Sequence, residues 1–431
     1  MRSEYIIGIC AWIASLVIAV FVFGAVAPEL VGRPKDLEIV QLSQEKPAFF
    51  ENVFSRKDLE ANDLLVNDPI VVVRGRPLLP AIHGVGPHDL LGFRNDKVPS
   101  VADIVTIGDS QTYGMNAVLA DAWPSVVRSL IPQVETYSMA IGGWSAPQYL
   151  SLFEKALSLE PSVVVVAIYT GNDALESFRT AYGVEYWRGL RLDPDAQLSD
   201  LPKVPFPPPK ESWYRLKRDD GLEVTFTPEL RAASNDSENR AVRVGYEIIS
   251  HAIQQMALVA NAKGFALYVT AIPTKELVYE KWLLNSQQSL PDSLKRLLLN
   301  ERAHIERISQ DTEKNAGAHY IDLIAPLQSA IDTVPDLYPV NQDGHPLRNG
   351  YRVIGETIAR AIKGDVVLLG DGFYRVNVSD QESWYYAKKG DSCVQFASAE
   401  AFTRVTSRGV EGIMSVPLKR LQRCTLQGRY Q

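Results

Sequence analysis

The sequence predicts an α/β fold in which a parallel sheet is covered by helices on both faces. Five short apolar segments have almost no polar alternation, which is typical of strands that are buried on both faces. Helical stretches separate these segments, and strands that alternate with helices form right-handed crossovers in a parallel sheet. The expected strands are residues 101–107, 134–140, 162–169, 265–272 and 318–324.

Helices are expected between and after these strands, around residues 120–131, 146–159 and 239–264 and after Gly350. Residues 174 to about 238 include the proline-rich stretch KVPFPPPKESW and break the alternation, so we predict an insertion there. An insertion at the carboxyl end of a parallel sheet lies beside the usual ligand site. From about residue 366 the stretches VVLLGDGFYRVNV and SCVQFASAEAFTRV indicate short strands, which predicts a small β-rich C-terminal region over 366–431.

The N-terminus predicts a membrane anchor. Residues 6–27 form a run of 22 residues without a charge or a proline. At about 1.5 Å per residue such a helix spans the roughly 30 Å hydrocarbon core. A cleaved signal peptide is the alternative, but the run is longer than an ordinary signal core and Pro28 would follow the cut. The remaining division is a tail at 1–5, a stalk at 28–98 and the main domain at 99–365.

Charge and cysteine content restrict the partners and the compartment. The net charge of −7 without long basic runs argues against nucleic acid. No metal-ligand spacing or phosphate-binding glycine loop is present, so no metal and no cofactor are expected. Cys393 and Cys424 are the only cysteines outside the anchor, and they are either a disulfide or two separate thiols. Arg2 before the anchor and Arg33 after it leave its orientation open. We expect the body on the periplasmic, extracytoplasmic side of the inner membrane.

The stretch ADIVTIGDSQTYGMN, residues 102–116, contains the first candidate for catalysis. Its strand should end near Ile107, with Gly108 and Asp109 in a tight turn and Ser110 at the start of a helix. Open α/β folds bind their ligands at this edge of the sheet. Read alone, the triplet Gly-Asp-Ser fits a helix cap as well as a nucleophile.

A serine nucleophile needs a base, and His345 is the best of six histidines. It lies in the loop NQDGHPLRNG, with Asp343 two residues upstream to orient the ring. Acyl transfer also needs donors for an oxyanion. Gly143 follows the second strand, and the triplet of Gly171, Asn172 and Asp173 follows the third, so all these stretches meet at one edge of the sheet.

These four stretches resemble the four sequence blocks of the SGNH (GDSL-type) hydrolase superfamily over about residues 100–363. The resemblance implies a flavodoxin-like three-layer fold. It also implies that Ser110 is the nucleophile, that His345 with Asp343 is the base, and that the backbone of Ser110 and Gly143 and the amide of Asn172 form the oxyanion hole. Asp109, Gly108, Gly171 and Asp173 would support these groups.

The sequence departs from the pattern of the superfamily in two places. Its last block reads Asp-x-His where Asp-x-x-His is usual, so either Asp343 supports the ring through a shifted loop or a backbone carbonyl takes over that role. Ser138 stands where an asparagine is expected, at a position that we interpret as structural.

The anchor and the stretch AIPTKELVYEKWL, residues 271–283, are similar to membrane-tethered alginate-type O-acetylation proteins. This implies an acylated donor, a glycan or lipid acceptor, and a multi-span membrane-bound O-acyltransferase as partner. An anchored esterase acting on glycans or lipids is the alternative, and a non-catalytic glycan-binding scaffold is a third. Lys275 in this stretch is expected to be solvated.

Overall fold

The computed structural model describes residues 64–81, 85–131, 134–217, 221–315, 317–366, 372–378, 382–389, 392–411, 413–415, 421 and 425–430. The expected anchor, the first part of the stalk and Cys424 lie outside these residues. Among the helices of the described residues, none is both long and apolar enough to cross a membrane.

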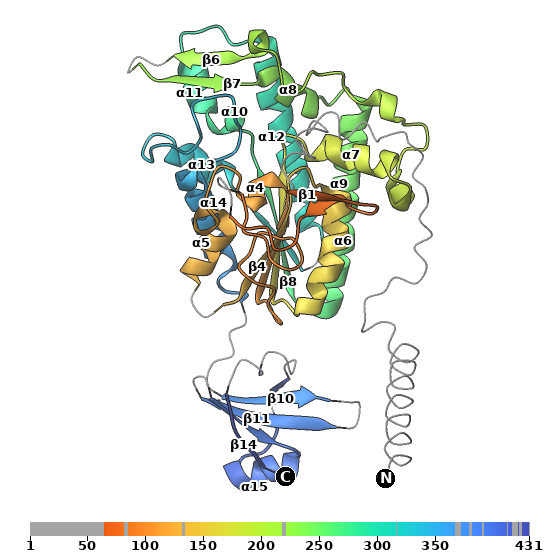
Figure 1. The fold of residues 1–431 in the computed structure, drawn as a ribbon, viewed down its shortest axis with the longest axis vertical. Helices are drawn as coiled ribbons and strands as arrows, with labels where there is room; N and C mark the ends of the chain where they lie inside the picture. The colour runs from red at the N-terminus through yellow and green to blue at the C-terminus, as the bar shows by residue number, and fades with distance from the viewer. Residues whose placement is uncertain are drawn as a thin grey trace, which may run out of the picture. The chain divides into compact units, whose positions relative to one another are not determined.

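A five-stranded parallel sheet forms the centre of the main domain (Figure 1). Its strands are β3 (Ile104–Gly108), β4 (Thr136–Ala140), β5 (Val163–Tyr169), β8 (Ala266–Ile272) and β9 (Ala318–Ile321). All five predicted strands are confirmed. The order β4-β3-β5-β8-β9 places the first of these strands between the second and the third. This is the flavodoxin-like doubly wound order, whose ligand site lies where the winding reverses, between β3 and β5.

Helices cover both faces of this sheet (Figure 1). One face carries α5 (Trp123–Leu130) and α14 (Arg348–Ile362), and the other carries α6 (Ala146–Ala156), α9 (Arg240–Lys263) and α12 (Asp292–Glu313). This double cover explains the uninterrupted apolar run of β5, in which every residue is buried. The expected start of α14 after Gly350 is wrong, because the helix begins at Arg348. Gly350 instead allows close packing, since a Cβ there would overlap the carbonyl oxygen of Leu337.

The region predicted as an insertion is largely ordered into short elements. It opens with α7 (Asp173–Gly183), which packs against α9. Three 3₁₀ turns follow, η3 (Glu185–Leu190), η4 (Leu198–Asp200) and η5 (Lys210–Ser212). An antiparallel hairpin, β6 (Tyr214–Lys217) and β7 (Glu223–Phe226), then leads to α8 (Pro228–Ser234). Phe226 is buried in the main core, so the hairpin is part of the domain.

The described part of the expected stalk also packs into the main core. Its hairpin consists of β1 (Leu65–Asp68) and β2 (Val72–Gly75). Val73 and Phe93 are buried in the same cluster as the central sheet. The indole nitrogen of Trp144 donates to the Val73 carbonyl oxygen at 2.8 Å, which ties the hairpin to the loop after β4.

The C-terminal region forms a second, mixed sheet in the order β13-β10-β11-β12-β14. Its strands are β10 (Gly372–Asn377), β11 (Ser383–Lys389), β12 (Ser392–Phe396), β13 (Met414–Ser415) and β14 (Thr425–Tyr430). The β-rich prediction is confirmed, but its second strand candidate ends in helix α15 (Ala399–Thr406). The hydroxyl of Ser398 caps that helix by accepting the backbone N–H of Ala401. Phe402, on the apolar side of the helix, is buried in a cluster of the C-terminal region. Cys393 is disulfide-bonded, and its pairing with Cys424 stays a prediction.

Replacing Gly245 by alanine should destabilise the domain. Gly245 lies where α9 meets α7, and a Cβ there would overlap the carbonyl oxygen of Ala174. Forcing two packed helices apart typically costs about 1–3 kcal/mol, which denaturant unfolding can measure. Gly189→Ala is the control, because no other group lies within 4 Å of the added carbon. Equal unfolding free energies for the two variants would contradict this packing.

Candidate active site

The turn after β3 fixes Ser110 at the start of the short helix α4 (Ser110–Tyr113). Asp109 is fully buried and caps this helix, since its Oδ1 accepts the backbone N–H of Gln111 at 2.9 Å. Gly108 lets the strand pass close to the helix, because a Cβ there would overlap the side chain of Thr112. The helix ends at Gly114, whose φ of +84° is the left-handed conformation that glycine adopts easily. Glycine and aspartate therefore shape the turn, and serine is presented by it.

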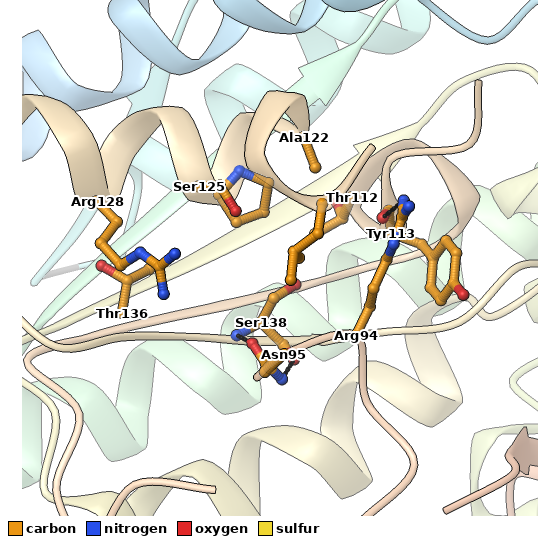
Figure 2. Close-up of a pocket in the computed structure, with 11 residues that line it drawn as sticks. Arg94, Asn95, Thr112, Tyr113, Ala122, Ser125, Arg128, Thr136 and Ser138 are labelled. Atoms are coloured by element: carbon orange, nitrogen blue, oxygen red, sulfur yellow. Dashed lines mark hydrogen bonds between the residues drawn. The ribbon is translucent and has the colours of Figure 1, made fainter. Parts of the chain in front are cut away.

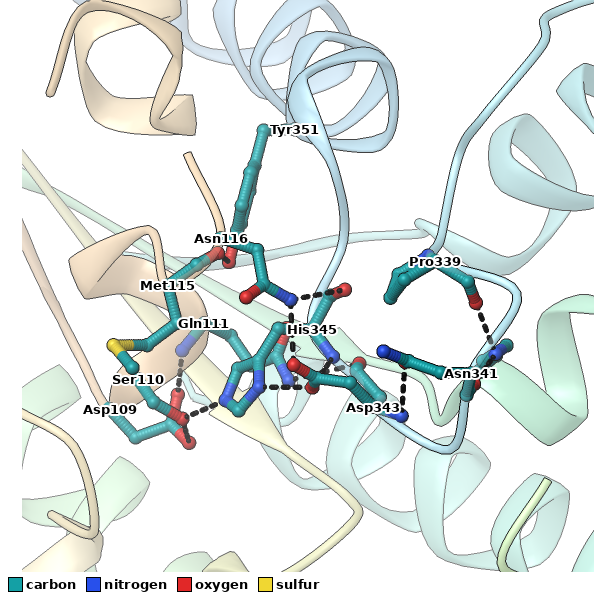
Figure 3. A network of polar contacts seen from close by, with 12 residues as sticks. Asp109, Ser110, Gln111, Met115, Asn116, Pro339, Asn341, Asp343, His345 and Tyr351 are labelled. Carbon is teal, nitrogen blue, oxygen red and sulfur yellow. Dashed lines mark hydrogen bonds and ion pairs between the residues drawn. The ribbon is translucent and has the colours of Figure 1, made fainter. Parts of the chain in front are cut away.

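Ser110, His345 and Asp343 form a connected array (Figure 3). The Oγ of Ser110 lies 2.9 Å from Nε2 of His345, and Nδ1 of the same ring lies 2.7 Å from Oδ1 of Asp343. A carboxylate only accepts hydrogen bonds, so Nδ1 carries the proton and Nε2 is free to accept the hydroxyl proton of Ser110. This is the arrangement of a serine nucleophile, its general base and the acid that orients the base.

Two carboxyl groups contact the Ser110–His345 pair, and their pKa values are shifted in opposite directions. Burial opposes ionisation of Asp343, but the hydrogen bonds and charge of His345 and a hydrogen bond from Asn116 hold the pKa of Asp343 well below its usual value. Burial raises the pKa of Asp109 to about 6. Oδ2 of Asp109 lies 3.2 Å from Oγ of Ser110, so it competes with His345 for the single hydroxyl proton.

Asn116 helps to explain how Asp343 contacts the ring of His345 although only one residue separates them. Its Nδ2 donates to Oδ2 of Asp343 at 2.8 Å, while the backbone N–H of His345 donates to Oδ1 of the same carboxylate at 2.9 Å. Both oxygens are thereby fixed, and the carboxylate faces the imidazole. Asn116 has a φ of +67°, a conformation in which asparagine is enriched among residues other than glycine. No motif of the sequence points to Asn116, although it ends the stretch 102–116 that contains Ser110.

The predicted oxyanion residues lie at the ends of the strands beside β3. Gly143 follows β4 with a φ of +79°. Its neighbour Gly142 lies close to the serine, since a Cβ added at Gly142 would be 3.5 Å from Cβ of Ser110. Asn172 follows β5 and occupies the N-cap of α7. Within the described part of the chain, its buried Oδ1 has no hydrogen-bond partner. The role of Gly143 and Asn172 as oxyanion donors stays a prediction.

Two supporting residues hold the loop that carries Asn172. Asp173 is buried, and its Oδ2 accepts hydrogen bonds from the Tyr149 hydroxyl at 2.8 Å and the Tyr169 backbone N–H at 3.0 Å. Burial, assisted by the charge of Asp109, raises the pKa of Asp173 well above its usual value. Gly171 lets the loop fold over the ring of Tyr169, because a Cβ there would overlap that ring.

The expectation that Lys275 is solvated is wrong. It begins α10 (Lys275–Val278), directly after β8, and is only 1% exposed. Its ammonium group donates to backbone carbonyl oxygens, two of which belong to the loop before His345. No motif indicates this role, because the acceptors are main-chain atoms.

A separate small pocket lies beside α4, lined by residues of α4, α5 and β4 (Figure 2). Arg94 on its wall donates to the carbonyl oxygens of Tyr113 and Gly114 at 3.0 and 2.8 Å. The side chain of Asn95 pairs with the backbone N–H and carbonyl of Ser138 on the edge strand β4. None of the three residues of the array lines this pocket, and Arg94 on its wall supports the turn that presents Ser110.

No protein-family model matches the chain, and no curated protein matches it. Similar solved structures include a GDSL-like lipase from Bacteroides thetaiotaomicron, with 13% identity over 61% of this chain and 87% of that chain and a TM-score of 0.33. An extracellular lipase from Streptomyces rimosus has 16% identity over 61% and 100%, with a TM-score of 0.36. An acetyl-xylooligosaccharide esterase from Geobacillus has 11% identity over 63% and 96%, with a TM-score of 0.33. Similarities this weak carry no argument about activity, so the chemistry is argued from the site itself.

Replacing Asn116 by glycine should weaken catalysis without unfolding the protein. Glycine keeps the left-handed backbone but removes the hydrogen bond to Asp343. A hydrogen bond to a charged group is worth about 1.5–3 kcal/mol, so we expect kcat/KM to fall by about tenfold or more. Asn349→Gly is the control, since Asn349 is only partly buried and donates to the carbonyl of Pro335 in the described contacts, away from the array. Equal kcat/KM values for the two variants would show that Asn116 does not hold the array.

Replacing Asp109 by asparagine should change the acid side of the pH profile. Asparagine keeps the helix cap but removes the ionisation of Asp109, whose pKa is about 6. The lowered pKa of Asp343 keeps that carboxylate ionised over the same range, so Asp109 is the carboxyl group of the two that titrates there. We expect log(kcat/KM) to change less steeply around pH 6 in Asp109→Asn than in the wild type. Identical pH profiles for the two proteins would contradict this role of Asp109.

Proposed function

We propose that this protein is a serine acyl-transfer enzyme of the SGNH type that works through an acyl-Ser110 intermediate. The observation that carries the proposal is the continuous path from Ser110 to His345 to Asp343, at 2.9 and 2.7 Å. A helix cap alone explains neither a histidine on the serine hydroxyl nor a carboxylate on the far side of that ring.

The reaction follows from the proton positions. His345 removes the hydroxyl proton as Ser110 attacks an ester carbonyl, and Asp343 stabilises the imidazolium that forms. The backbone N–H groups of Ser110 and Gly143 and the amide of Asn172 are the proposed donors to the oxyanion. The imidazolium then protonates the departing alcohol, which leaves an acyl ester on Ser110. A second hydroxyl, activated by the same His345, releases the acyl group.

The identity of the acceptor that attacks the acyl-Ser110 ester decides between hydrolysis and transfer. We propose a sugar hydroxyl of an envelope or secreted polysaccharide as acceptor, with the chain held to the membrane by residues 6–27. An anchored body and a multi-span O-acyltransferase partner supplying the acyl group would suit transfer to a polymer. This part of the proposal rests on the apolar N-terminal run and on the sequence resemblance. Water as acceptor gives the alternative, an anchored esterase.

Ser110→Ala should abolish turnover of an activated acetyl ester. Loss of the nucleophile in such an array lowers kcat by a factor on the order of 10³ or more. Ser129→Ala is the control, because Ser129 is an exposed helical serine whose hydroxyl donates to the Val126 carbonyl. Unchanged rates in Ser110→Ala would reject the enzyme. Mass analysis of an added oligosaccharide then separates the outcomes, since acetylated sugar supports transfer and acetate alone supports the esterase.

A further inference from the structure

The environment of Lys275 is unusual for a lysine, because lysine side chains are almost never fully buried without partners. Its partners here are three backbone carbonyl oxygens. The Nζ atom lies 3.0 Å from the oxygen of Thr225, 2.5 Å from that of Pro339 and 2.7 Å from that of Asn341. An ammonium group has three protons, so these contacts use its full donor capacity.

Two of these carbonyls belong to the loop that carries the catalytic base. Asn341 connects its own carbonyl to the catalytic loop, since its side-chain Oδ1 accepts the backbone N–H of Asp343 at 3.0 Å (Figure 3). Asp343 in turn accepts the Nδ1 proton of His345. A short chain of hydrogen bonds therefore runs from the ammonium group of Lys275 to the imidazole ring.

The other end of Lys275 is fixed to the central sheet. The backbone N–H and the hydroxyl of Thr274 donate to the carboxylate of Glu301 on α12, at 2.7 and 2.6 Å. The hydroxyl of Thr170, at the end of β5, donates to the same carboxylate at 2.5 Å. The backbone of Lys275 is thus tied to the ends of two neighbouring strands and to a long helix.

A buried positive charge is costly, and an apolar residue of similar size would fill the space at lower cost. Burial lowers the pKa of Lys275 to about 8, although the charges of Glu276 and Asp343 act in the opposite direction. The ring of Phe226 also lies beside the ammonium group, with its centroid 5.3 Å from Nζ. The loop before His345 has no strand or helix between 337 and 345. Backbone N–H groups hold the carbonyls of Leu337 and Val340, at 2.9 and 2.8 Å, and the ammonium group of Lys275 holds those of Pro339 and Asn341.

We propose that Lys275 is a positioning residue for the acyl-transfer reaction: its ammonium group holds the 337–345 loop so that Asp343 and His345 stay in line with Ser110. The inference rests on the proposed function for its catalytic consequence. The effect of Lys275 on the position of the His345 ring can be measured without any substrate turnover.

The test compares Lys275→Met with Lys281→Met. Lys281 on α11 (Glu280–Asn285) is an exposed lysine whose amine pairs with Asp332 at 2.5 Å, so its loss controls for removing a nearby charge. We expect Lys275→Met to shift the Cε1–H NMR signal of His345 and to lower kcat by about 100-fold with little change in KM, because a small misplacement of a catalytic group has this effect. Lys281→Met should match the wild type in both measurements.

An unshifted His345 signal with a wild-type kcat in folded Lys275→Met would overturn the inference. If the wild type turns over no ester, the acyl-transfer proposal fails by itself, and the NMR comparison still decides the role of Lys275.

A pH titration of the wild type keeps the inference testable if Lys275→Met does not fold. A neutral amine has only two protons for three carbonyls, so the His345 signal and kcat should change together as the pH rises through about 8. Because the pKa of Lys275 is lowered in the folded protein, its deprotonation does not reduce global stability, and the melting temperature should not fall in step. A His345 signal and a kcat that both stay flat from about pH 7 to 9.5 would overturn the inference.

Discussion

The hydrogen bond between Ser110 and His345 is the interaction on which the candidate site depends. It joins two residues that are 235 positions apart in the chain. Ser110 is placed by a buried strand and a capped helix, whereas His345 lies on a loop without regular structure. Such a loop must be held from outside if its imidazole is to stay within hydrogen-bonding distance. Asn116, which follows the serine helix, holds the loop through Asp343. Lys275, just after the end of β8, is the proposed support for the carbonyls of the same loop.

The parallel sheet makes this convergence possible. In the order β4-β3-β5, the strand that leads to Ser110 lies between those that lead to Gly143 and Asn172. Parallel strands end at one edge, so three segments spread over more than sixty residues meet there. The reversal of winding between β3 and β5 leaves this edge open for a ligand. The buried carboxyl groups of Asp109 and Asp173 shape the two turns that flank it.

The sequence was sufficient to predict the strands and the array of Ser110, His345 and Asp343, because each has a signature in residue type. Runs of valine and isoleucine mark a doubly covered sheet, and serine, histidine and aspartate are the residue types that nucleophilic catalysis uses. Asn116 and Lys275 could not be found in this way. Their contacts are a carboxylate 227 positions away and main-chain oxygens, neither of which leaves a local pattern. The strand predicted over the residues of α15 is wrong, because a single buried aromatic, Phe402, fits either periodicity in so short a segment.

In the proposed mechanism the acyl group passes through Ser110. The most direct measurement is to quench the purified chain with acid during its first turnover of an acetyl ester and to locate the acetyl group by peptide mass analysis. We predict a burst of product and an acetyl group on the peptide that contains Ser110. Turnover without any acetylated peptide, or acetyl bound stoichiometrically to a different residue, would contradict the mechanism.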